Sequence, residues 1–313
     1  MKHPAFPADA RFIEAREGFV RGLSTSKLNL FLEVLGKRPD GYHEIVSVFH
    51  EIDLADEITI ALDPSRKADS LKAHGRPIGA SSEHNLALQA VRAFRTAFPP
   101  LPRVRIDLKK RIPVGGGLGG GSSNAAFVLD ALRLLTGTPA TMEPMVDLAR
   151  SIGSDVPFFL TGGSAVCRGR GEIVQPLPFH PSMQFVLAIP SFSLSTEKVY
   201  RSVVPDPASR DVTPFLQSLE KYADDPEASF PPCFNRLGAA ASRVSPDLET
   251  LRRQLETSTL SSWSVTGSGA VMYSIARKTE DLRERIADIE KWGVLDIALA
   301  GTFFRRRDFF REG

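Results

Sequence analysis

The first part of the chain alternates between hydrophobic and polar residues, which predicts strands. In residues 26–34, one side of the expected strand carries Leu28, Leu30, Leu32 and Val34, and the other carries Lys27, Asn29, Phe31 and Glu33. A period of two residues is typical of a strand, so Lys27 and Asn29 are expected to point to the same side. Residues 43–52 and 56–62 are expected to form two further strands, and the turn-forming residues of GKRPDGYH separate them from the first.

A glycine-rich stretch, PVGGGLGGGSS at residues 113–123, lies between a predicted strand and a predicted helix. Residues 103–110 alternate as a strand, and residues 122–137 have the spacing of a helix that ends at Gly137. The stretch is therefore predicted to be a strand-to-helix loop. Six of the seven residues from 115 to 121 are glycine, although glycine loses more backbone freedom on folding than any other residue. This cost indicates that something must approach the backbone closely here.

The remaining elements follow from the same kinds of pattern. Asn85 is expected to cap a helix that ends before Pro99 and Pro100. The others are a helix over 141–152, strands over 163–174 and 185–190, helices near 214–222 and 246–258, a turn and strand within 262–276, and another helix after that strand. Strands and helices do not alternate regularly, which favours an α+β fold of two lobes over a doubly wound sheet. Turn residues near 175–182 suggest a division into domains 1–178 and 179–313.

Composition and charge favour a small molecule as the partner. The 313 residues carry a formal net charge of +2, which gives no reason to expect nucleic acid or an anionic membrane. Two cysteines without paired spacing exclude a disulfide framework and favour the cytoplasm. The N-terminal segment lacks the apolar core of a signal peptide, and no run approaches the roughly 20 apolar residues of a membrane span. We expect a cytoplasmic monomer or weak homodimer.

The glycine loop is interpreted as a phosphate-binding site, because exposed backbone N–H groups at the start of a helix favour an anion. Its Gly115-x-Gly117-x-x-Gly120 spacing also fits the dinucleotide fingerprint. That fingerprint needs an early βαβ unit, whereas this loop lies a third of the way along the chain after an antiparallel start. A Walker A loop needs a lysine after its last glycine, and serines stand there instead. A flexible linker would not lie between a strand and a capped helix.

Three motifs resemble those of the GHMP kinase superfamily. PVGGGLGGGSSNAA, residues 113–126, is similar to the second motif, the loop that wraps the triphosphate of ATP. SKLNLFLEV, residues 26–34, resembles the first motif, and SVTGSGAVMYSI, residues 264–275, resembles the third. The resemblance implies the two-lobed α+β GHMP kinase fold, with an N-terminal ATP-binding lobe built on a mixed sheet and a C-terminal α/β lobe. The active site is expected in the cleft between them.

Longer stretches resemble one kinase family of this superfamily. KLNLFLEVLGKRPDGYHEIVSVFHEIDLADEITI and IGSDVPFFLTGGSAVCRGRGE are similar to the kinases that use ATP to phosphorylate the 2-hydroxyl of 4-diphosphocytidyl-2-C-methyl-D-erythritol, in the non-mevalonate isoprenoid pathway. The resemblance implies that Lys27 and Asp155 are the catalytic pair. A carboxylate can accept the proton of the attacking alcohol, and a nearby ammonium keeps it ionised and stabilises developing charge. Without this context, Lys27 fits a solvated strand lysine, and Asp155 fits a turn or helix cap.

The resemblance also implies which residues bind the two substrates. Tyr42 and His43 are expected to stack on the cytosine and to hydrogen-bond its polar edge, although their segment alone predicts only a surface turn. The other residues expected to bind the alcohol substrate are Asn29, Thr196, Tyr200, Gly267 and Gly269. The expected ATP-binding residues are Pro113, Val114, Gly115, Gly116, Gly117, Leu118, Gly119, Gly120, Gly121, Ser122 and Ser123. Ser123 is also the candidate protein ligand of Mg²⁺, which bridges the phosphates.

Two other functions are compatible with the glycine loop. A GHMP kinase for another small alcohol, such as homoserine or mevalonate, would have no use for a base clamp at Tyr42 and His43. A non-catalytic ATP-binding regulator on the same fold would not need Lys27 and Asp155.

Overall fold

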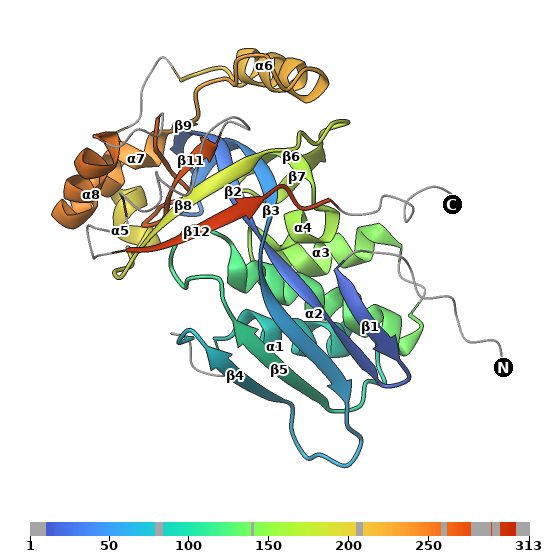
Figure 1. Ribbon diagram of the computed structural model, residues 1–313. Coiled ribbons are helices and arrows are strands. Elements are labelled where there is room, and N and C mark those ends of the chain that lie inside the picture. Colours follow the sequence, from blue (N-terminus) through green and yellow to red (C-terminus); the bar gives the residue numbers. More distant parts are fainter. Residues whose placement is uncertain are drawn as a thin grey trace.

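Two sheets form the framework of the computed structural model (Figure 1). It describes residues 11–78, 84–138, 141–204, 209–257, 262–276, 289 and 295–304. The strands of the larger sheet are β1 (Phe12–Arg16), β2 (Phe19–Lys37), β3 (His43–Leu62), β4 (Ser70–Gly75), β5 (Val104–Lys110), β6 (Ser164–Gly169), β7 (Ile173–Pro176) and β9 (Phe234–Asn235). Their order is β1-β2-β3-β5-β4, with β6 on β3, β7 on β6 and β9 on β2. The pairs β4–β5 and β2–β9 are parallel and the other pairs are antiparallel, so the sheet is mixed.

The long antiparallel strands β2 and β3 pair with each other over most of their length and lie in the middle of this sheet. The strand predicted over 26–34 lies within β2, but the two strands predicted over 43–52 and 56–62 form the single strand β3, so that prediction is wrong. The first part of β3 has β6 as its second neighbour, and its last part has β5. The pairing of β2 with β3 is irregular between Ser24 and Ser26 of β2, opposite the part of β3 where the second neighbour changes from β6 to β5. The break in the sequence pattern therefore marks a bulge and a change of partner, not a turn.

The prediction of a single strand over 163–174 is also wrong, because these residues form the hairpin of β6 and β7. Gly169, the last residue of β6, and Gly171, in the connecting turn, have φ angles of 71° and 116°. Residues with side chains rarely adopt such angles, so the two glycines allow the chain to reverse within what looked like one strand.

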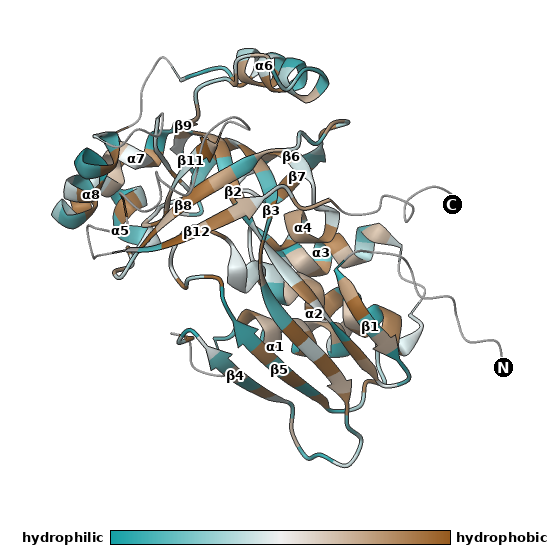
Figure 2. Ribbon diagram, in the orientation of Figure 1, coloured by the Kyte–Doolittle hydropathy of each residue, from teal (hydrophilic) through white to brown (hydrophobic). Residues whose placement is uncertain are grey.

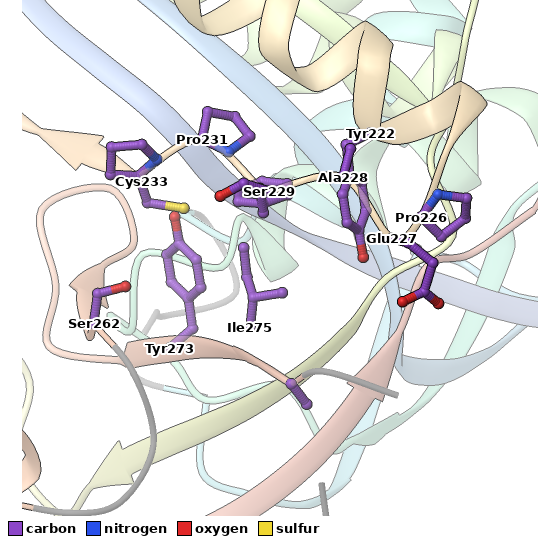
Figure 3. A pocket seen from close by; sticks show the side chains of 13 residues that line it. Tyr222, Pro226, Glu227, Ala228, Ser229, Pro231, Cys233, Ser262, Tyr273 and Ile275 are labelled. Atoms are coloured by element: carbon purple, nitrogen blue, oxygen red, sulfur yellow. The ribbon is translucent and has the colours of Figure 1, made fainter. Parts of the chain in front are cut away.

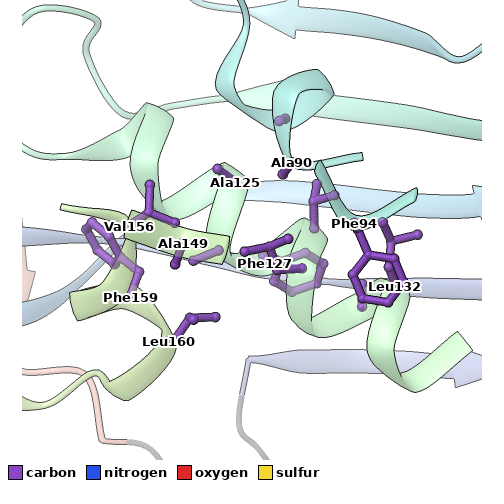
Figure 4. Close-up of a cluster of buried hydrophobic side chains, with 14 of the residues drawn as sticks. Ala90, Phe94, Ala125, Phe127, Leu132, Ala149, Val156, Phe159 and Leu160 are labelled. Atoms are coloured by element: carbon purple, nitrogen blue, oxygen red, sulfur yellow. The ribbon is translucent and has the colours of Figure 1, made fainter. Parts of the chain in front are cut away.

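Four helices cover one face of the larger sheet (Figure 1). They are α1 (Leu86–Ala97), α2 (Gly120–Thr136), α3 (Met142–Ile152) and α4 (Val156–Thr161). The helices predicted at α1, α2 and α3 are confirmed: Asn85 caps α1 by accepting from the Ala87 N–H, and Gly137 is the C-cap of α2, which begins at Gly120, earlier than predicted. Phe94, Phe127 and Phe159 belong to a cluster of buried side chains from these helices and the sheet beneath them (Figure 4). This cluster fixes the start of α2, and hence the glycine loop, against the sheet.

The second half of the chain builds a smaller antiparallel sheet in the order β10-β11-β8-β12. Its strands are β8 (Gln184–Pro190), β10 (Ser264–Val265), β11 (Met272–Ala276) and β12 (Leu295–Gly301). The helices of this half are α5 (Thr196–Arg201), α6 (Thr213–Asp224), α7 (Arg236–Val244) and α8 (Pro246–Glu256). Figure 2 shows α8 as largely hydrophilic, whereas β8 and α4 are largely hydrophobic.

The predicted α+β class is confirmed, as are the strand over 185–190 and the helices near 214–222 and 246–258. The short helices α4, α5 and α7 were not predicted. The helix expected after residue 276 lies outside the described residues, apart from residue 289, and the end of the C-terminal tail also lies outside them. Among the described helices, none is long and apolar enough to cross a membrane.

Candidate active site

The glycine loop joins β5 to α2 and lies against the middle of β2. Gly115, Gly117 and Gly119 have φ angles of 70°, 80° and 73°, and Gly119 is the N-cap residue of α2. The Lys27 N–H of β2 donates to the Leu118 carbonyl at 3.0 Å. The predicted strand-to-helix loop is therefore confirmed, and it runs beside the strand that carries Lys27.

The third predicted motif packs directly on this loop. The Val271 N–H donates to the Gly116 carbonyl at 3.3 Å, and Thr266 Oγ1 donates to the Gly117 carbonyl at 3.3 Å. A Cβ atom added at Gly117 would lie only 2.0 Å from the Thr266 carbonyl oxygen, and one at Gly267 would lie 3.2 Å from the Gly117 carbonyl oxygen. These contacts leave no space for side chains, which explains why both segments contain glycine at their junction.

Lys27 occupies the centre of the site. It is 3% exposed, and its Nζ donates to Asn29 Oδ1 at 2.6 Å and to the Gly117 carbonyl at 2.8 Å. The alternative of a solvated strand lysine is thus excluded. Burial lowers the pKa of the Lys27 ammonium, and the negative charge of Asp155 partly opposes that shift.

Asp155 is the residue immediately before α4, and its carboxylate faces Lys27. The distance from Lys27 Nζ to Asp155 Oδ2 is 3.8 Å, an ion pair rather than a hydrogen bond. The Asp155 side chain makes no capping hydrogen bond to α4 and is 29% exposed. Its carboxylate is therefore accessible to a ligand, and side-chain capping does not account for its presence.

Asn29 connects Lys27 with the third motif. Its Oδ1 accepts from Lys27, its Nδ2 donates to Ser47 Oγ at 2.9 Å, and its backbone N–H donates to Thr266 Oγ1 at 3.2 Å. The expectation that Lys27 and Asn29 point to the same side of the strand is confirmed. Thr266 was not among the predicted residues, although it lies within the third motif.

The predicted base-binding residues lie on the rim of this site. Tyr42 is 54% exposed, and the ring centroids of His43 and Tyr200 are 5.2 Å apart. Burial and the nearby Asp155 charge raise the pKa of the Tyr200 hydroxyl. Thr196, which begins α5, shares a hydrogen bond of 2.9 Å with Ser268 Oγ of the third motif. Residues from both halves of the chain therefore meet around Asp155.

Arg170 is a residue of this rim that the sequence analysis missed. Its guanidinium carbon lies 4.6 Å from the centroid of the Tyr42 ring, a cation–π distance. The same turn brings Gly171 beside Asp155, since a Cβ atom there would lie 3.3 Å from Asp155 Oδ1. The one available signal was a basic residue between the two glycines of the segment GRG.

Two cavities lie outside this site. One, of about 460 Å³, is lined by residues that include Tyr222, Cys233 and Tyr273 (Figure 3). The other, of about 610 Å³, is lined by α7, α8 and neighbouring strands. Neither is lined by Lys27 or Asp155, but Tyr273 of the first cavity is connected to β2, because its hydroxyl donates to the Asn29 carbonyl at 2.7 Å.

The sequence has relatives that match most of its length. Residues 85–163 match the GHMP kinases N terminal domain. A Protochlamydia amoebophila (strain UWE25) protein named 4-diphosphocytidyl-2-C-methyl-D-erythritol kinase is 36% identical over 258 residues, covering 82% of this chain and 85% of the relative. A Persephonella marina (strain DSM 14350 / EX-H1) protein of the same name is 33% identical over 276 residues, covering 88% and 98%.

Solved structures agree with this similarity. A 4-(cytidine 5'-diphospho)-2C-methyl-D-erythritol kinase superposes with a TM-score of 0.74 at 34% identity, and the match covers 90% of this chain and 100% of that one. A homoserine kinase from Cytophaga hutchinsonii has a TM-score of 0.65 at 13% identity, with 94% and 97% covered, and so shares the fold alone.

Proposed function

Since the chain belongs to the family of 4-diphosphocytidyl-2-C-methyl-D-erythritol kinases, within the GHMP kinases, we propose that it uses Lys27 and Asp155 to carry out that family's reaction. It phosphorylates the 2-hydroxyl of its substrate with ATP, giving the 2-phosphate and ADP, in the methylerythritol phosphate pathway to isoprenoid precursors. One observation carries the residue assignment: Lys27 Nζ lies 2.8 Å from the glycine loop and 3.8 Å from the Asp155 carboxylate.

In the proposed reaction, the 2-hydroxyl oxygen attacks the γ-phosphorus of ATP, and the bond to the β,γ-bridging oxygen breaks to release ADP. The hydroxyl proton passes to the accessible carboxylate of Asp155, and the ammonium of Lys27 stabilises negative charge on the transferred group. Asn29 holds the ammonium between the loop and the carboxylate, because its Oδ1 accepts from Lys27 Nζ. Positioning and electrostatics account for most of the catalysis expected for phosphoryl transfer.

We propose that residues 113–123 bind the phosphates of ATP through backbone N–H groups, and that the third motif holds the loop in shape. Bound Mg²⁺ would neutralise part of the negative charge of the phosphates. Ser123 is the proposed protein ligand; its Oγ accepts a hydrogen bond from Ser24 at 2.8 Å and keeps a second lone pair. In the part of the chain that the structure describes, no group of three or more His, Cys, Asp or Glu side chains could hold a metal ion.

The pH profile tests the charge of Lys27. We expect kcat to fall as pH rises through a pKa below 10.5, the ordinary value of lysine, because burial favours the neutral amine. At pH values between the lowered pKa of Lys27 in the folded protein and 10.5, Lys27 is more protonated in the unfolded chain than in the folded protein. The contribution of Lys27 to the free energy of unfolding therefore increases with pH in this range. Loss of activity in this range without loss of thermal stability would support the assignment. A constant kcat up to that ordinary value would contradict it.

Tyr42 is proposed to stack on the cytosine, supported from its other side by Arg170. Tyr42→Ala is expected to weaken binding of the cytidine substrate by about 1–3 kcal/mol, the contribution typical of base stacking on an aromatic ring. The KM for that substrate should rise while the KM for ATP stays the same, because Tyr42 is not part of the glycine loop. Steady-state kinetics with each substrate varied in turn measure both values, and an unchanged KM for the cytidine substrate would refute the clamp.

Two ligand experiments separate this function from its alternatives. In a thermal-shift assay, CDP or CMP should stabilise the protein, whereas homoserine and mevalonate should not. Protection by mevalonate or homoserine alone would indicate a different alcohol substrate. ADP release that depends on 4-diphosphocytidyl-2-C-methyl-D-erythritol then tests turnover directly, since a protein that binds ATP without releasing ADP would be a regulator.

We also propose the domain division 1–178 and 179–313, a cytoplasmic location, and a monomer or weak homodimer. The division is supported by the strands, because β1 to β7 belong to the larger sheet and β8 opens the smaller one. Strand β9 is an exception, since it pairs with β2 across the proposed boundary. Both cysteines are free thiols, which fits a reducing compartment.

A further inference from the structure

Asp56 of β3 is a buried carboxylate that contacts both ends of the glycine loop. It is fully buried, and its Oδ1 accepts from the backbone N–H groups of Arg111 at 2.7 Å and Ile112 at 2.8 Å, where the chain enters the loop. Its Oδ2 accepts from Lys110 Nζ at 2.5 Å and from Asn124 Nδ2 at 3.0 Å. Asn124 lies in α2, just after the loop ends. One side chain therefore links the entry of the loop to its exit.

Ser24 completes this connection from the neighbouring strand. It pairs with Asp56 across β2 and β3, and its Oγ accepts from Asn124 Nδ2 at 2.9 Å and donates to Ser123 Oγ at 2.8 Å. The first residues of α2 are thus attached to two adjacent strands of the sheet. A buried network in which every partner is satisfied holds a single geometry, which a preorganised anion site requires.

The charge of Asp56 by itself would oppose phosphate binding. Lys110 Nζ lies beneath the first residue of α2, since a Cβ atom added at Gly120 would be 3.0 Å from it. A cation there adds to the positive end of the helix, which attracts anions. Asp56 neutralises part of that potential. Any benefit of Asp56 to ATP binding must therefore come from the geometry that it imposes on the loop.

We propose that Asp56 is a positioning residue for ATP: it sets the separation between the two ends of the glycine loop, so that the loop N–H groups converge on the phosphates. The proposal rests on the ATP-binding role proposed for the loop. The Asp56 carboxylate accepts from Lys110, Arg111 and Ile112 before the loop and from Asn124 after it, so Asp56 is proposed to act through the loop and not on ATP directly.

Asp56→Asn tests this role with a side chain of nearly the same shape. The asparagine has one carbonyl oxygen in place of two carboxylate oxygens, so it cannot accept all four hydrogen bonds. We expect the KM for ATP, and the Kd of a non-hydrolysable ATP analogue by calorimetry, to rise by about tenfold or more, since small misplacements of binding groups have large effects. The KM for the cytidine substrate should not change. Unchanged ATP affinity would overturn the proposal. Tighter ATP binding would also overturn it, because the negative charge of Asp56 would then affect binding more than the loop geometry that Asp56 imposes.

Asp69→Asn is the matched control. Asp69 is also a largely buried carboxylate: it accepts from both terminal nitrogens of Arg95, at 2.6 and 2.7 Å, and from the Val104 N–H at 3.0 Å, with no contact to the loop. We expect Asp69→Asn to lower Tm while leaving ATP affinity unchanged. A weaker affinity for ATP in this control would mean that general destabilisation explains the effect, which would overturn the proposal.

Asn124→Ala covers the case in which Asp56→Asn does not fold. It leaves the Asp56–Lys110 pair intact and removes the hydrogen bonds of Asn124 to Asp56 and to Ser24, while the Ser24–Ser123 bond remains. We therefore expect ATP affinity to fall by about three- to tenfold, as for loss of a typical hydrogen bond. Unchanged affinity would again overturn the proposal. Gly117→Ala distinguishes this failure from failure of the proposed function: if it abolishes ATP binding while Asp56→Asn does not affect it, only the role of Asp56 is wrong. If neither variant weakens binding, the loop is not the ATP site.

Discussion

Asp155→Asn is expected to lower kcat by about 10²- to 10⁴-fold, the contribution typical of a general acid–base residue. Asparagine keeps the shape of the side chain but cannot accept the hydroxyl proton. Because the Asp155 carboxylate contacts neither α4 through a cap nor the glycine loop, ATP affinity and Tm should stay close to those of the wild type. Turnover under saturating substrates, ATP-analogue binding by calorimetry and thermal unfolding measure the three quantities.

Asp147→Asn is a suitable control for this variant. Asp147 lies on the surface of α3, where it pairs with Arg150, and it is remote from Lys27 in the described contacts. Its replacement should leave kcat unchanged. Turnover of Asp155→Asn at the wild-type rate would remove Asp155 from the mechanism, whereas a joint loss of turnover and ATP affinity would indicate a disturbed loop.

Gly117→Ala is expected to abolish ATP binding and to lower stability. At a φ of 80°, alanine would cost about 1–2 kcal/mol in conformation alone, because its Cβ approaches the following carbonyl. That Cβ would also lie 2.0 Å from the Thr266 carbonyl oxygen, so the loop and the third motif must move apart. A shift of about 1 Å in binding groups can cost 10²-fold, and we expect at least this loss of affinity for an ATP analogue.

Gly238→Ala provides the comparison for the loss of glycine. Gly238 lies within α7, has no positive φ, and a Cβ atom there would meet nothing within 4 Å. The substitution should leave ATP affinity unchanged and raise stability by about 0.5–1 kcal/mol, because alanine favours a helix over glycine. Wild-type ATP affinity in Gly117→Ala would mean that the close packing of loop and third motif is not needed for binding.

Local patterns predicted many of the elements that carry the site. The alternation around Lys27 predicted part of β2, and the glycine stretch before a helical period predicted the loop before α2. The prediction of strand boundaries was wrong where strand pairing or a tight turn, which the hydrophobic pattern does not report, decided where a strand begins or ends. The extra residues that β3 carries opposite residues 24–26 of β2, together with the change of partner along β3, resembled a break between two strands. Two glycines hid the reversal between β6 and β7.

The sequence alone indicated the kinase family through the resemblance of three motifs, at residues 26–34, 113–126 and 264–275, because each motif is a continuous run of residues that can be compared without a structure. Only the tertiary structure decided which residues meet. The 3.8 Å between Lys27 and Asp155, the position of Arg170 over Tyr42, and the hold of Asp56 on both ends of the loop all depend on sheet register and helix packing. Such contacts join segments far apart in the chain, and each forms only when the whole core has brought its elements together.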